Sequence, residues 1–259
     1  MSAADAPAQR PWLDTPAGPL RSRLVLGIEQ YPSAQLIADV LTAGGCDVFI
    51  TTFDLRSRRS SVPLFDVAAV LDVETFTWVG TTSFARSEDE ALRTVEMLHG
   101  SFAITTIKLD VRGEDNTPDV PATLRVAREL CTQGFAVLPL VPADVAVVAE
   151  LVDAGCAAVR LVASPVGSAR GIADPVAMRL AIEAAAVPVV VECGIGSVAH
   201  AAQAMELGAD AVLVNAAVVR AADPVRMAAA MRHAVLGGRL AAGLAGQAAG
   251  GVPVPVGMV

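Results

Sequence analysis

The chain has 259 residues and a net charge of −8, with 54% hydrophobic and 18% charged residues. Its length fits one barrel of eight β/α units, which typically needs about 250 residues. The negative charge argues against a nucleic-acid-binding protein, because neutralising phosphates requires clustered Lys and Arg. No uninterrupted apolar run reaches the roughly 18 residues of a membrane-spanning helix. We therefore expect a soluble, cytoplasmic protein without a nucleic-acid or membrane partner.

The first and last segments differ from the middle of the chain. Residues 1–20 contain Pro, Asp and Arg but no continuous apolar stretch, which predicts a flexible arm. From Gly237 onward the composition is dominated by Gly, Ala, Pro and Val without a periodic apolar face, so residues 237–259 are expected to form a flexible tail. The intervening residues 21–236 are expected to form a single catalytic domain.

Within that domain, runs of β-branched and apolar residues alternate with helical patterns. The eight predicted strands are Arg23–Gly27, Asp47–Thr52, Thr77–Thr81, Ala103–Val111, Ala136–Val141, Ala157–Val162, Pro188–Glu192 and Ala211–Asn215. The clearest predicted helices are Ser33–Ala43, Glu88–His99, Val120–Thr132, Ala143–Ala154, Asp174–Ala185, Val198–Leu207 and Pro224–Leu236. This alternation predicts the α/β class and favours a closed (β/α)8 TIM barrel over an open, doubly wound sheet.

The cysteine and histidine content argues against a metal centre. The four cysteines show neither CxxC pairs nor metal-ligand spacing, and the three histidines are dispersed. We expect reduced core thiols, no metal and no bound cofactor. The cysteines are Cys46, Cys131, Cys156 and Cys193.

Lys108 is the first candidate for chemistry. In this fold the reactive groups come from the C-terminal ends of the strands and the loops that follow them. Lys108 and Asp110 lie two residues apart, and therefore on one face of the fourth strand, near the barrel mouth. Burial disfavours the charged form of a lysine, so Lys108 could form a Schiff base with a carbonyl substrate. The alternative is a structural ion pair between Lys108 and Asp110.

The ends of the seventh and eighth strands indicate a phosphate site. The loops after these strands customarily bind phosphate in this fold, because free N–H groups at a helix N-terminus attract an anion. We therefore predict a phosphorylated substrate, with ordinary strand-to-helix turns as the alternative. The candidate binding residues here are Cys193, Gly194, Gly196, Asn215 and Ala216.

Two further segments contribute candidates. Glu192, at the end of the seventh strand, could transfer protons during enolisation of an iminium, or could instead pair with Lys108 or Arg170. The loop after the sixth strand is rich in small residues, so Gly167 and Ser168 could approach a ligand closely. Arg170 could bind an anion or be a solvated loop charge. For His200, in the first turn of the following helix, we expect a surface role.

Several ordered motifs on this scaffold carry a family resemblance: from about Arg23 to Leu240 the chain resembles bacterial thiazole synthase. The resemblance implies that Lys108 forms a Schiff base with a phosphorylated ketose, and that a small sulfur carrier protein delivers sulfur from a C-terminal thiocarboxylate. It also aligns Gly167, Cys193, Gly194, Asn215 and Ala216 with backbone positions that hold the substrate. The motifs are Ile107–Asp110, Gly134–Pro139, Ala163–Ser168, Val187–Gly196, Glu206–Asn215 and Ala222–Ala228.

Departures from the family pattern narrow this expectation. Asp110 stands where the family's strand-four motif has Glu, and Glu192 stands where the family has Asp before Ala-Gly-Ile-Gly. The segment Thr51–Arg56 replaces the usual Ala-x-Arg-Arg. These changes suggest a paralogue similar to the 2-thiosugar synthase branch, which places sulfur on a sugar phosphate such as glucose 6-phosphate. Asp110 and Glu192 are then the expected proton-transfer residues.

Three other functions remain open at this point. The first is a true thiazole synthase acting on 1-deoxy-D-xylulose 5-phosphate. The second is a non-catalytic scaffold that binds the carrier protein, with Lys108 in an ion pair. The third is a phosphosugar aldolase or isomerase that needs no carrier. Apolar helix faces and the resemblance also favour a homo-oligomer.

Overall fold

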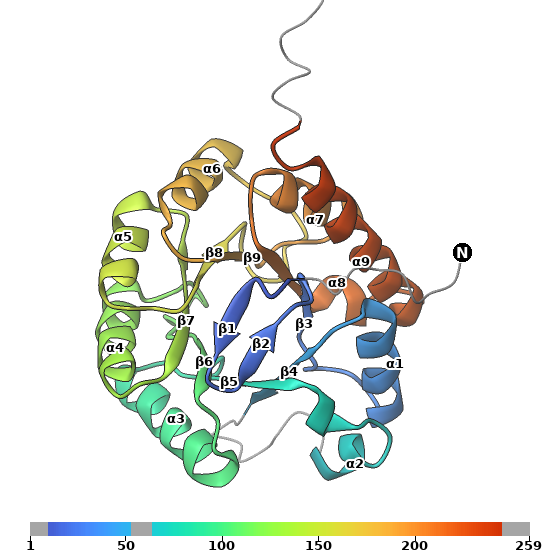
Figure 1. The fold of residues 1–259 in the computed structure, drawn as a ribbon, viewed down its shortest axis with the longest axis horizontal. Coiled ribbons are helices and arrows are strands. Elements are labelled where there is room, and N and C mark those ends of the chain that lie inside the picture. Colours follow the sequence, from blue (N-terminus) through green and yellow to red (C-terminus); the bar gives the residue numbers. More distant parts are fainter. Residues whose placement is uncertain (1–9, 53–63, 245–259) are drawn as a thin grey trace, which may run out of the picture.

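The computed structural model describes residues 10–52 and 64–244, and in that part of the chain a ring of helices surrounds a barrel of parallel strands (Figure 1). Neighbouring strands are hydrogen-bonded in the order β3-β10-β9-β8-β7-β6-β5-β4, and β3 lies beside β4, so the barrel is nearly closed. The predicted fold class and all eight predicted strands are confirmed. The strands are β3 (Leu24–Leu26), β4 (Val48–Thr52), β5 (Thr77–Thr81), β6 (Thr106–Leu109), β7 (Ala136–Pro142), β8 (Val159–Val162), β9 (Val189–Glu192) and β10 (Ala211–Val214).

Asp47 spans the seam between the first and last strands of this order. Its carboxylate accepts hydrogen bonds from the backbone N–H groups of Arg21 (2.7 Å) and Ser22 (3.1 Å), just before β3. A side chain therefore joins the two edges where the barrel closes.

The seven predicted helices are also confirmed. A short polar side chain caps the N-terminus of each of them. The side chain of a Ser or Asp accepts a hydrogen bond from a backbone N–H in the first turn, which satisfies a group that the helix itself cannot pair. These helices are α1 (Ala34–Gly44), α3 (Glu88–Phe102), α4 (Val120–Thr132), α5 (Val145–Asp153), α6 (Pro175–Ala184), α7 (Val198–Glu206) and α9 (Pro224–Ala241). The sequence did not predict the short α2 (Leu64–Ala68), the 3-10 turn Val73–Thr75 or α8 (Ala216–Val219).

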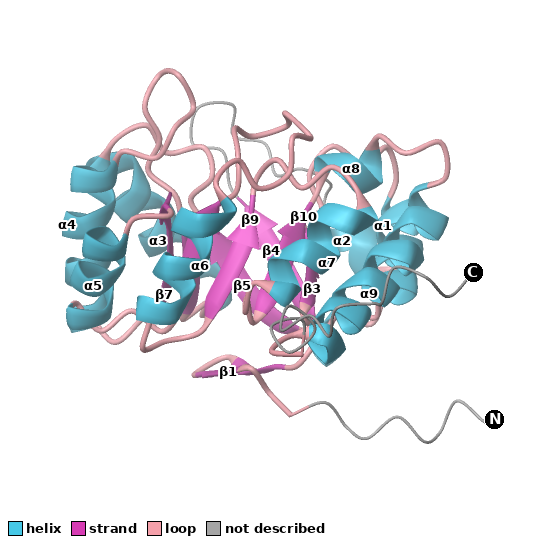
Figure 2. Cartoon of the chain, turned by 90° about the horizontal axis from the view of Figure 1, so that it is seen from above, coloured by secondary structure: helices cyan, strands magenta, loops and turns pink. Residues whose placement is uncertain are grey.

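The expected flexible arm over residues 1–20 is wrong for its second half. The strands β1 (Leu13–Thr15) and β2 (Gly18–Leu20) form an antiparallel hairpin below the barrel (Figure 2). Trp12 is buried, and its indole N–H donates to the carbonyl of Ser22 (2.9 Å). The hairpin is ordered because its apolar side chains close the end of the barrel where the strands begin. Residues 1–9 lie outside the described part of the chain.

The expected flexible tail from Gly237 is wrong for its first residues. Helix α9 continues through Gly237 and Gly238 to Ala241. Gly238 is buried against α7, where a Cβ atom would come within 2.5 Å of the carbonyl oxygen of Ala202. The glycine therefore serves close helix packing at this position. Residues 245–259 lie outside the described part, as does most of the Thr51–Arg56 segment.

Alternation along the strands separates two buried regions. Ile107 and Leu109 of β6 face the helices and belong to the larger core. A smaller apolar cluster fills the inside of the barrel next to the hairpin, and includes Trp12, Leu20, Val25, Val48, Val79, Leu138, Ala158 and Val190. Lys108 and Asp110 alternate with Ile107 and Leu109, so they point inside the barrel, beyond this cluster.

Candidate active site

Four charged side chains form a ring inside the mouth of the barrel. Lys108 Nζ lies 2.9 Å from Asp110 Oδ2, which lies 3.1 Å from Arg160 Nη2. Arg160 Nη1 lies 2.9 Å from Glu192 Oε2, and Glu192 Oε1 lies 3.9 Å from Lys108 Nζ. Lys108, Arg160 and Glu192 lie on β6, β8 and β9, and Asp110 directly follows β6; each of the four is at most 6% exposed. The charges alternate in sign around the ring, and the contact between Lys108 and Glu192 is its longest.

Lys108 is also distinctive in the composition of the chain. Of the 19 Lys and Arg residues in the chain, Lys108 is the only lysine. The only side-chain amine of the sequence thus lies at the C-terminal end of a barrel strand, where this fold places its chemistry.

Asp110 is the most heavily paired member of the ring. Besides Lys108 and Arg160, it contacts Arg112, whose Nη2 lies 2.9 Å from Asp110 Oδ1. Burial by itself raises the pKa of the Asp110 carboxyl, but the positive charges of Arg160, Lys108 and Arg112 outweigh it and hold that pKa well below the usual range. Asp110 is therefore a carboxylate at neutral pH and a weak proton acceptor.

Glu192 has fewer charged contacts than Asp110. Arg160 is its one hydrogen-bonded cation among the described residues, and Glu192 Oε1 faces Lys108 and the thiol of Cys193, whose sulfur lies 3.6 Å away. Burial, and then the negative charge of Glu192, raise the pKa of the Cys193 thiol to about 12, so the thiol is neutral. Cys193 also has a left-handed backbone (φ 64°), which is strained for a non-glycine residue.

The loops after β8 and β9 pack directly against each other. Gly171 N–H donates to the carbonyl of Gly194 (2.8 Å), and a Cβ atom on Gly194 would collide with the Ser164 hydroxyl. A Cβ atom on Gly196 would likewise collide with Ala169. Close packing of the two loops thus already requires both of these predicted phosphate-site glycines.

The other predicted residues of the sixth-strand loop are more open. Gly167 is exposed, has a left-handed backbone (φ 72°), and would have no atom within 4 Å of an added Cβ. The Ser168 hydroxyl lies 3.0 Å from that of Ser164. Arg170 is exposed and makes no hydrogen bond or ion pair within residues 10–52 and 64–244. Glu192 thus pairs with Arg160 rather than with Arg170.

His200 is less superficial than expected. It is half-buried, its Nδ1 accepts a hydrogen bond from the backbone N–H of Gly196 (3.2 Å), and its ring packs against Gly171. The imidazole therefore supports the two packed loops.

Asn215 and Ala216 lie where β10 passes into α8. The side-chain amide of Asn215 donates to Glu29 Oε2 (3.0 Å), on the loop after β3, while its Oδ1 is buried without a partner among the described groups. Ala216 is the first residue of α8 and is half-buried. The structure thus places the predicted residues of β8, β9 and β10 on adjacent loops of the barrel mouth.

Arg160, Arg112 and Glu29 were missed by the sequence analysis. Arg160 had a usable signal, because it interrupts the apolar run Ala157–Val162 at an inward-facing position, two residues after Ala158. Arg112 and Glu29 lie in loops, and their contacts depend on how the barrel closes.

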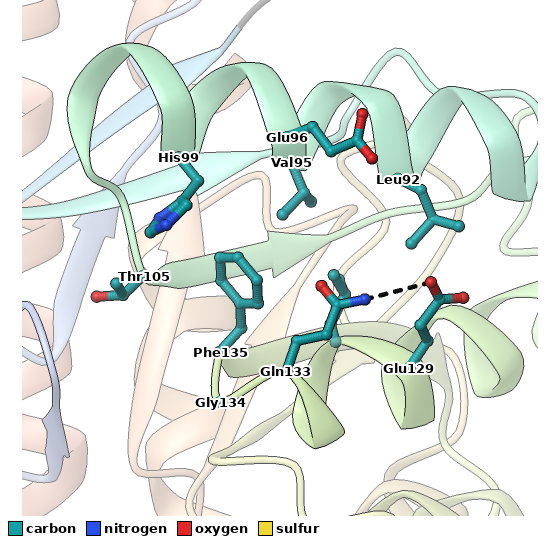
Figure 3. A pocket seen from close by; sticks show the side chains of 10 residues that line it. Leu92, Val95, Glu96, His99, Thr105, Glu129, Gln133, Gly134 and Phe135 are labelled. Carbon is teal, nitrogen blue, oxygen red and sulfur yellow. Dashed lines mark hydrogen bonds between the residues drawn. The ribbon is translucent and has the colours of Figure 1, made fainter.

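A pocket of about 350 Å³ lies outside the barrel, between the C-terminal ends of α3 and α4 (Figure 3). Its lining includes His99, Glu96, Glu129 and Phe135. Thr105 and Phe135 immediately precede β6 and β7, so this pocket lies at the end of the barrel opposite to Lys108. It is separate from the charged ring.

Residues 10–52 and 64–244 contain no group of His, Cys, Asp and Glu that could hold a metal ion. In the same part of the chain, no helix is long and apolar enough to span a membrane.

The fold and the ring define a class: a (β/α)8 barrel with a paired lysine at the mouth. The model of the family described as "Thiazole biosynthesis protein ThiG" matches residues 17–250, and the chain belongs to this family. The thiazole synthase of Exiguobacterium sibiricum is 40% identical over 224 residues, covering 85% of this chain and 86% of that protein. The thiazole synthase of Methylobacterium sp. (strain 4-46) is 41% identical over 230 residues, covering 87% and 84%.

One solved structure resembles the chain more strongly. The structure of the BexX/CysO complex of Amycolatopsis orientalis contains a chain with 56% identity and a TM-score of 0.87, covering 89% of this chain and 94% of that one. The predicted resemblance to the thiazole synthase family is thereby confirmed. Because the relatives are synthases, the comparison also supports the prediction that this protein is an enzyme.

Proposed function

We propose that the protein is a sulfur-incorporating synthase in which Lys108 forms a Schiff base with a phosphorylated sugar. The favoured substrate is glucose 6-phosphate. The observation that carries this proposal is the position of the single lysine, buried at the barrel mouth between the carboxylates of Asp110 and Glu192. An amine held between carboxylates has acceptors for the protons that imine formation must move.

The sulfur donor is a small ubiquitin-like carrier protein with a C-terminal thiocarboxylate. The solved complex of BexX, which is similar to this chain, with CysO supports the proposal that this chain also binds a partner protein. The thiocarboxylate acts as a cosubstrate, and no resident cofactor is needed. The exposed apolar side chains of Val176 and Leu180 on α6 support a homo-oligomer.

The phosphate of the sugar binds where the loops after β8, β9 and β10 lie side by side. Gly167 and Arg170 support this placement, because the first leaves open space beside its backbone and the second is an exposed guanidinium without a described partner. The contributing residues are Gly167, Ser168, Arg170, Cys193, Gly194, Gly196, Asn215 and Ala216.

The reaction exchanges one oxygen atom for one sulfur atom. After ring opening, proton transfer moves the carbonyl from C1 to C2, and the amine of Lys108 condenses there with loss of water. The thiocarboxylate sulfur then adds to C2, the acyl group passes from sulfur to a sugar oxygen, and water hydrolyses this ester so that the carrier leaves as a carboxylate. Expulsion of the Lys108 amine leaves a thione at C2, which tautomerises to the 2-thiosugar phosphate, so no oxidant or reductant is consumed.

Glu192 is the main proton-transfer group, and Asp110 serves chiefly as a counter-ion. Asp110 contacts three cations, whereas Glu192 is hydrogen-bonded to one and turns its second oxygen toward Lys108. A carboxylate with fewer cationic partners accepts a proton more readily.

A second candidate is a thiazole synthase acting on 1-deoxy-D-xylulose 5-phosphate. The names of the relatives at 40% and 41% identity favour it. The exchanges at Asp110 and Glu192 and the higher identity to BexX favour the first candidate.

An assay with matched omissions separates the candidates. The protein is incubated with a thiocarboxylated carrier protein and either glucose 6-phosphate or 1-deoxy-D-xylulose 5-phosphate, and products are identified by mass spectrometry. A sugar phosphate with one oxygen replaced by sulfur is expected from glucose 6-phosphate only. Turnover without the carrier would indicate an aldolase or isomerase, and carrier binding without any sugar adduct would indicate a scaffold.

A further inference from the structure

Arg160 is the member of the charged ring that has no role in the proposed reaction. Its side chain is 1% exposed, and its guanidinium donates to two backbone carbonyls, of Leu138 (2.8 Å) and Leu109 (2.7 Å). These bonds fix it against β7 and β6, while the same group contacts Asp110 and Glu192. A guanidinium anchored in this way holds both carboxylates in place.

The charges around Lys108 balance without Lys108 itself. Arg160 and Arg112 are permanent cations, since an arginine side chain is not deprotonated in proteins. They pair with the two carboxylates of Asp110 and Glu192. With a neutral amine on Lys108 the cluster has no net charge, and with an ammonium it carries one positive charge.

We infer that Arg160 is a positioning residue that holds Asp110 and Glu192 in place around Lys108 and cancels one of their two negative charges. The assignment deepens the proposed function, in which Lys108 is the nucleophile. If Arg160 were absent, two carboxylates would face Lys108 with only Arg112 to balance them. The ammonium form would then persist to higher pH.

Other groups near Lys108 do not change this balance. Ser83, on the loop after β5, lies 3.4 Å from Lys108 Nζ and is uncharged, as is Thr81 of the same strand. The Cys193 thiol is neutral because its pKa is raised. Glu29 is bound to the side chain of Asn215. Within the described residues, the balance therefore depends on the two carboxylates and the two arginines.

The test uses formaldehyde with cyanoborohydride, which methylates free amines whether or not the sugar reaction occurs. Because the chain has a single lysine, mass spectrometry of the Lys108 peptide follows this one side chain. The rate is measured from pH 5 to pH 10 for the wild type and for Arg160→Met, Glu192→Gln and the double variant. Arg125→Met, which removes an exposed arginine paired with Glu88, is the control.

Arg160→Met should move the pH midpoint of Lys108 methylation upward by at least about one unit, which is about tenfold slower reaction at neutral pH. Glu192→Gln should move the midpoint downward, and the double variant should return it toward the wild-type value. Arg125→Met should leave it unchanged. If Arg160 had a purely structural role, the two single variants would not shift the midpoint in opposite directions. The double variant would then not return the midpoint toward the wild-type value.

Two results would overturn the assignment: an unchanged midpoint in Arg160→Met, or a double variant that shifts as far as Arg160→Met alone. If circular dichroism shows that Arg160→Met does not fold, Glu192→Gln and Arg160→Lys provide the test. Glu192→Gln must lower the pH midpoint of Lys108 methylation. Arg160→Lys, which keeps the positive charge, must leave that midpoint at the wild-type value. Normal charge-dependent methylation without any sugar phosphate adduct would instead refute the proposed function and leave the assignment standing.

Discussion

The two ends of the barrel interior are built on the same strands but differ in chemistry. Next to the β1–β2 hairpin, the lower layer is apolar and includes Leu138, Ala158 and Val190. Two residues further along β8 and β9, the upper layer holds Arg160 and Glu192. One step of the strand alternation therefore separates apolar packing from buried charge, so each layer can be altered by substitutions that leave the other in place.

The largest effect is expected for Lys108→Ala in the upper layer. Loss of the nucleophile should lower turnover by about three orders of magnitude or more. Lys108→Arg is the matched variant, because it keeps a cation beside Asp110 but cannot form a Schiff base. Turnover is measured by product mass spectrometry, and folding by thermal denaturation. Substantial activity in either variant would contradict the covalent role of Lys108.

Asp110→Asn should produce the largest loss of stability. It leaves Lys108, Arg112 and Arg160 without their shared carboxylate, which should lower the free energy of unfolding by about 3–5 kcal/mol. Glu88→Gln, in an exposed pair with Arg125, should change that free energy far less, because solvent screens an exposed ion pair. Urea denaturation measures both, and similar losses would argue against the importance of the buried cluster.

The pH dependence of stability follows from the same carboxylate. The folded-state pKa of Asp110 lies below its ordinary value of 3.8, because burial is outweighed by the charges of Arg160, Lys108 and Arg112. The stabilisation is therefore complete above the ordinary value and is lost as the pH falls below about 4. Denaturation of the wild type between pH 7 and pH 3 should show this loss, and Asp110→Asn should show less of it. A parallel decline in both proteins would assign the acid sensitivity to other groups.

Trp12→Ala tests the lower layer. Removing this buried indole from the hairpin should lower the free energy of unfolding by about 3 kcal/mol. The exposed Leu240→Ala serves as the control and should change it by less than about 0.5 kcal/mol. In the folded Trp12 variant, the rate of Lys108 methylation should be unchanged. A large change in that rate would show that the two layers are coupled.

The smallest effect concerns the reactivity of the cysteine thiols. The contact with the thiol of Cys156, 3.9 Å away between sulfur atoms, lowers the pKa of Cys131, whereas burial raises that of Cys46 to about 12. Cys193 is half-buried like Cys131, but its pKa is raised to about 12, so iodoacetamide at pH 8 should modify Cys131 before Cys46 and Cys193. Peptide mass spectrometry gives the order, and earlier modification of Cys193 would contradict its raised pKa.

The strands and long helices could be predicted because local signals determine them. Continuous apolar runs mark the strands, and Ser or Asp marks the helix starts, as at Ser87 and Asp119. The hairpin at residues 13–20 could not, because its order depends on Trp12 and Leu20 reaching the barrel interior. The end of α9 was placed too early because glycine favours termination, while packing against Ala202 overrides that preference.

The positions of the candidate residues in the fold could be predicted one by one, but their contacts with each other could not. The position of Lys108 on a strand end identified it, and the strand alternation placed Asp110 beside it. The ring required the barrel to close, since Arg160 and Glu192 are 32 residues apart in sequence. The alternative of a simple Lys108–Asp110 ion pair is incomplete, because Asp110 is shared among three cations.

Borohydride trapping tests the central claim most directly. The protein is incubated with glucose 6-phosphate, reduced with borohydride and analysed by intact mass and peptide mapping. A single adduct with the mass of the sugar phosphate, less one oxygen, is predicted on the Lys108 peptide and absent from Lys108→Arg. Absence of an adduct with both glucose 6-phosphate and 1-deoxy-D-xylulose 5-phosphate, or an adduct that persists in Lys108→Arg, would contradict the Schiff base.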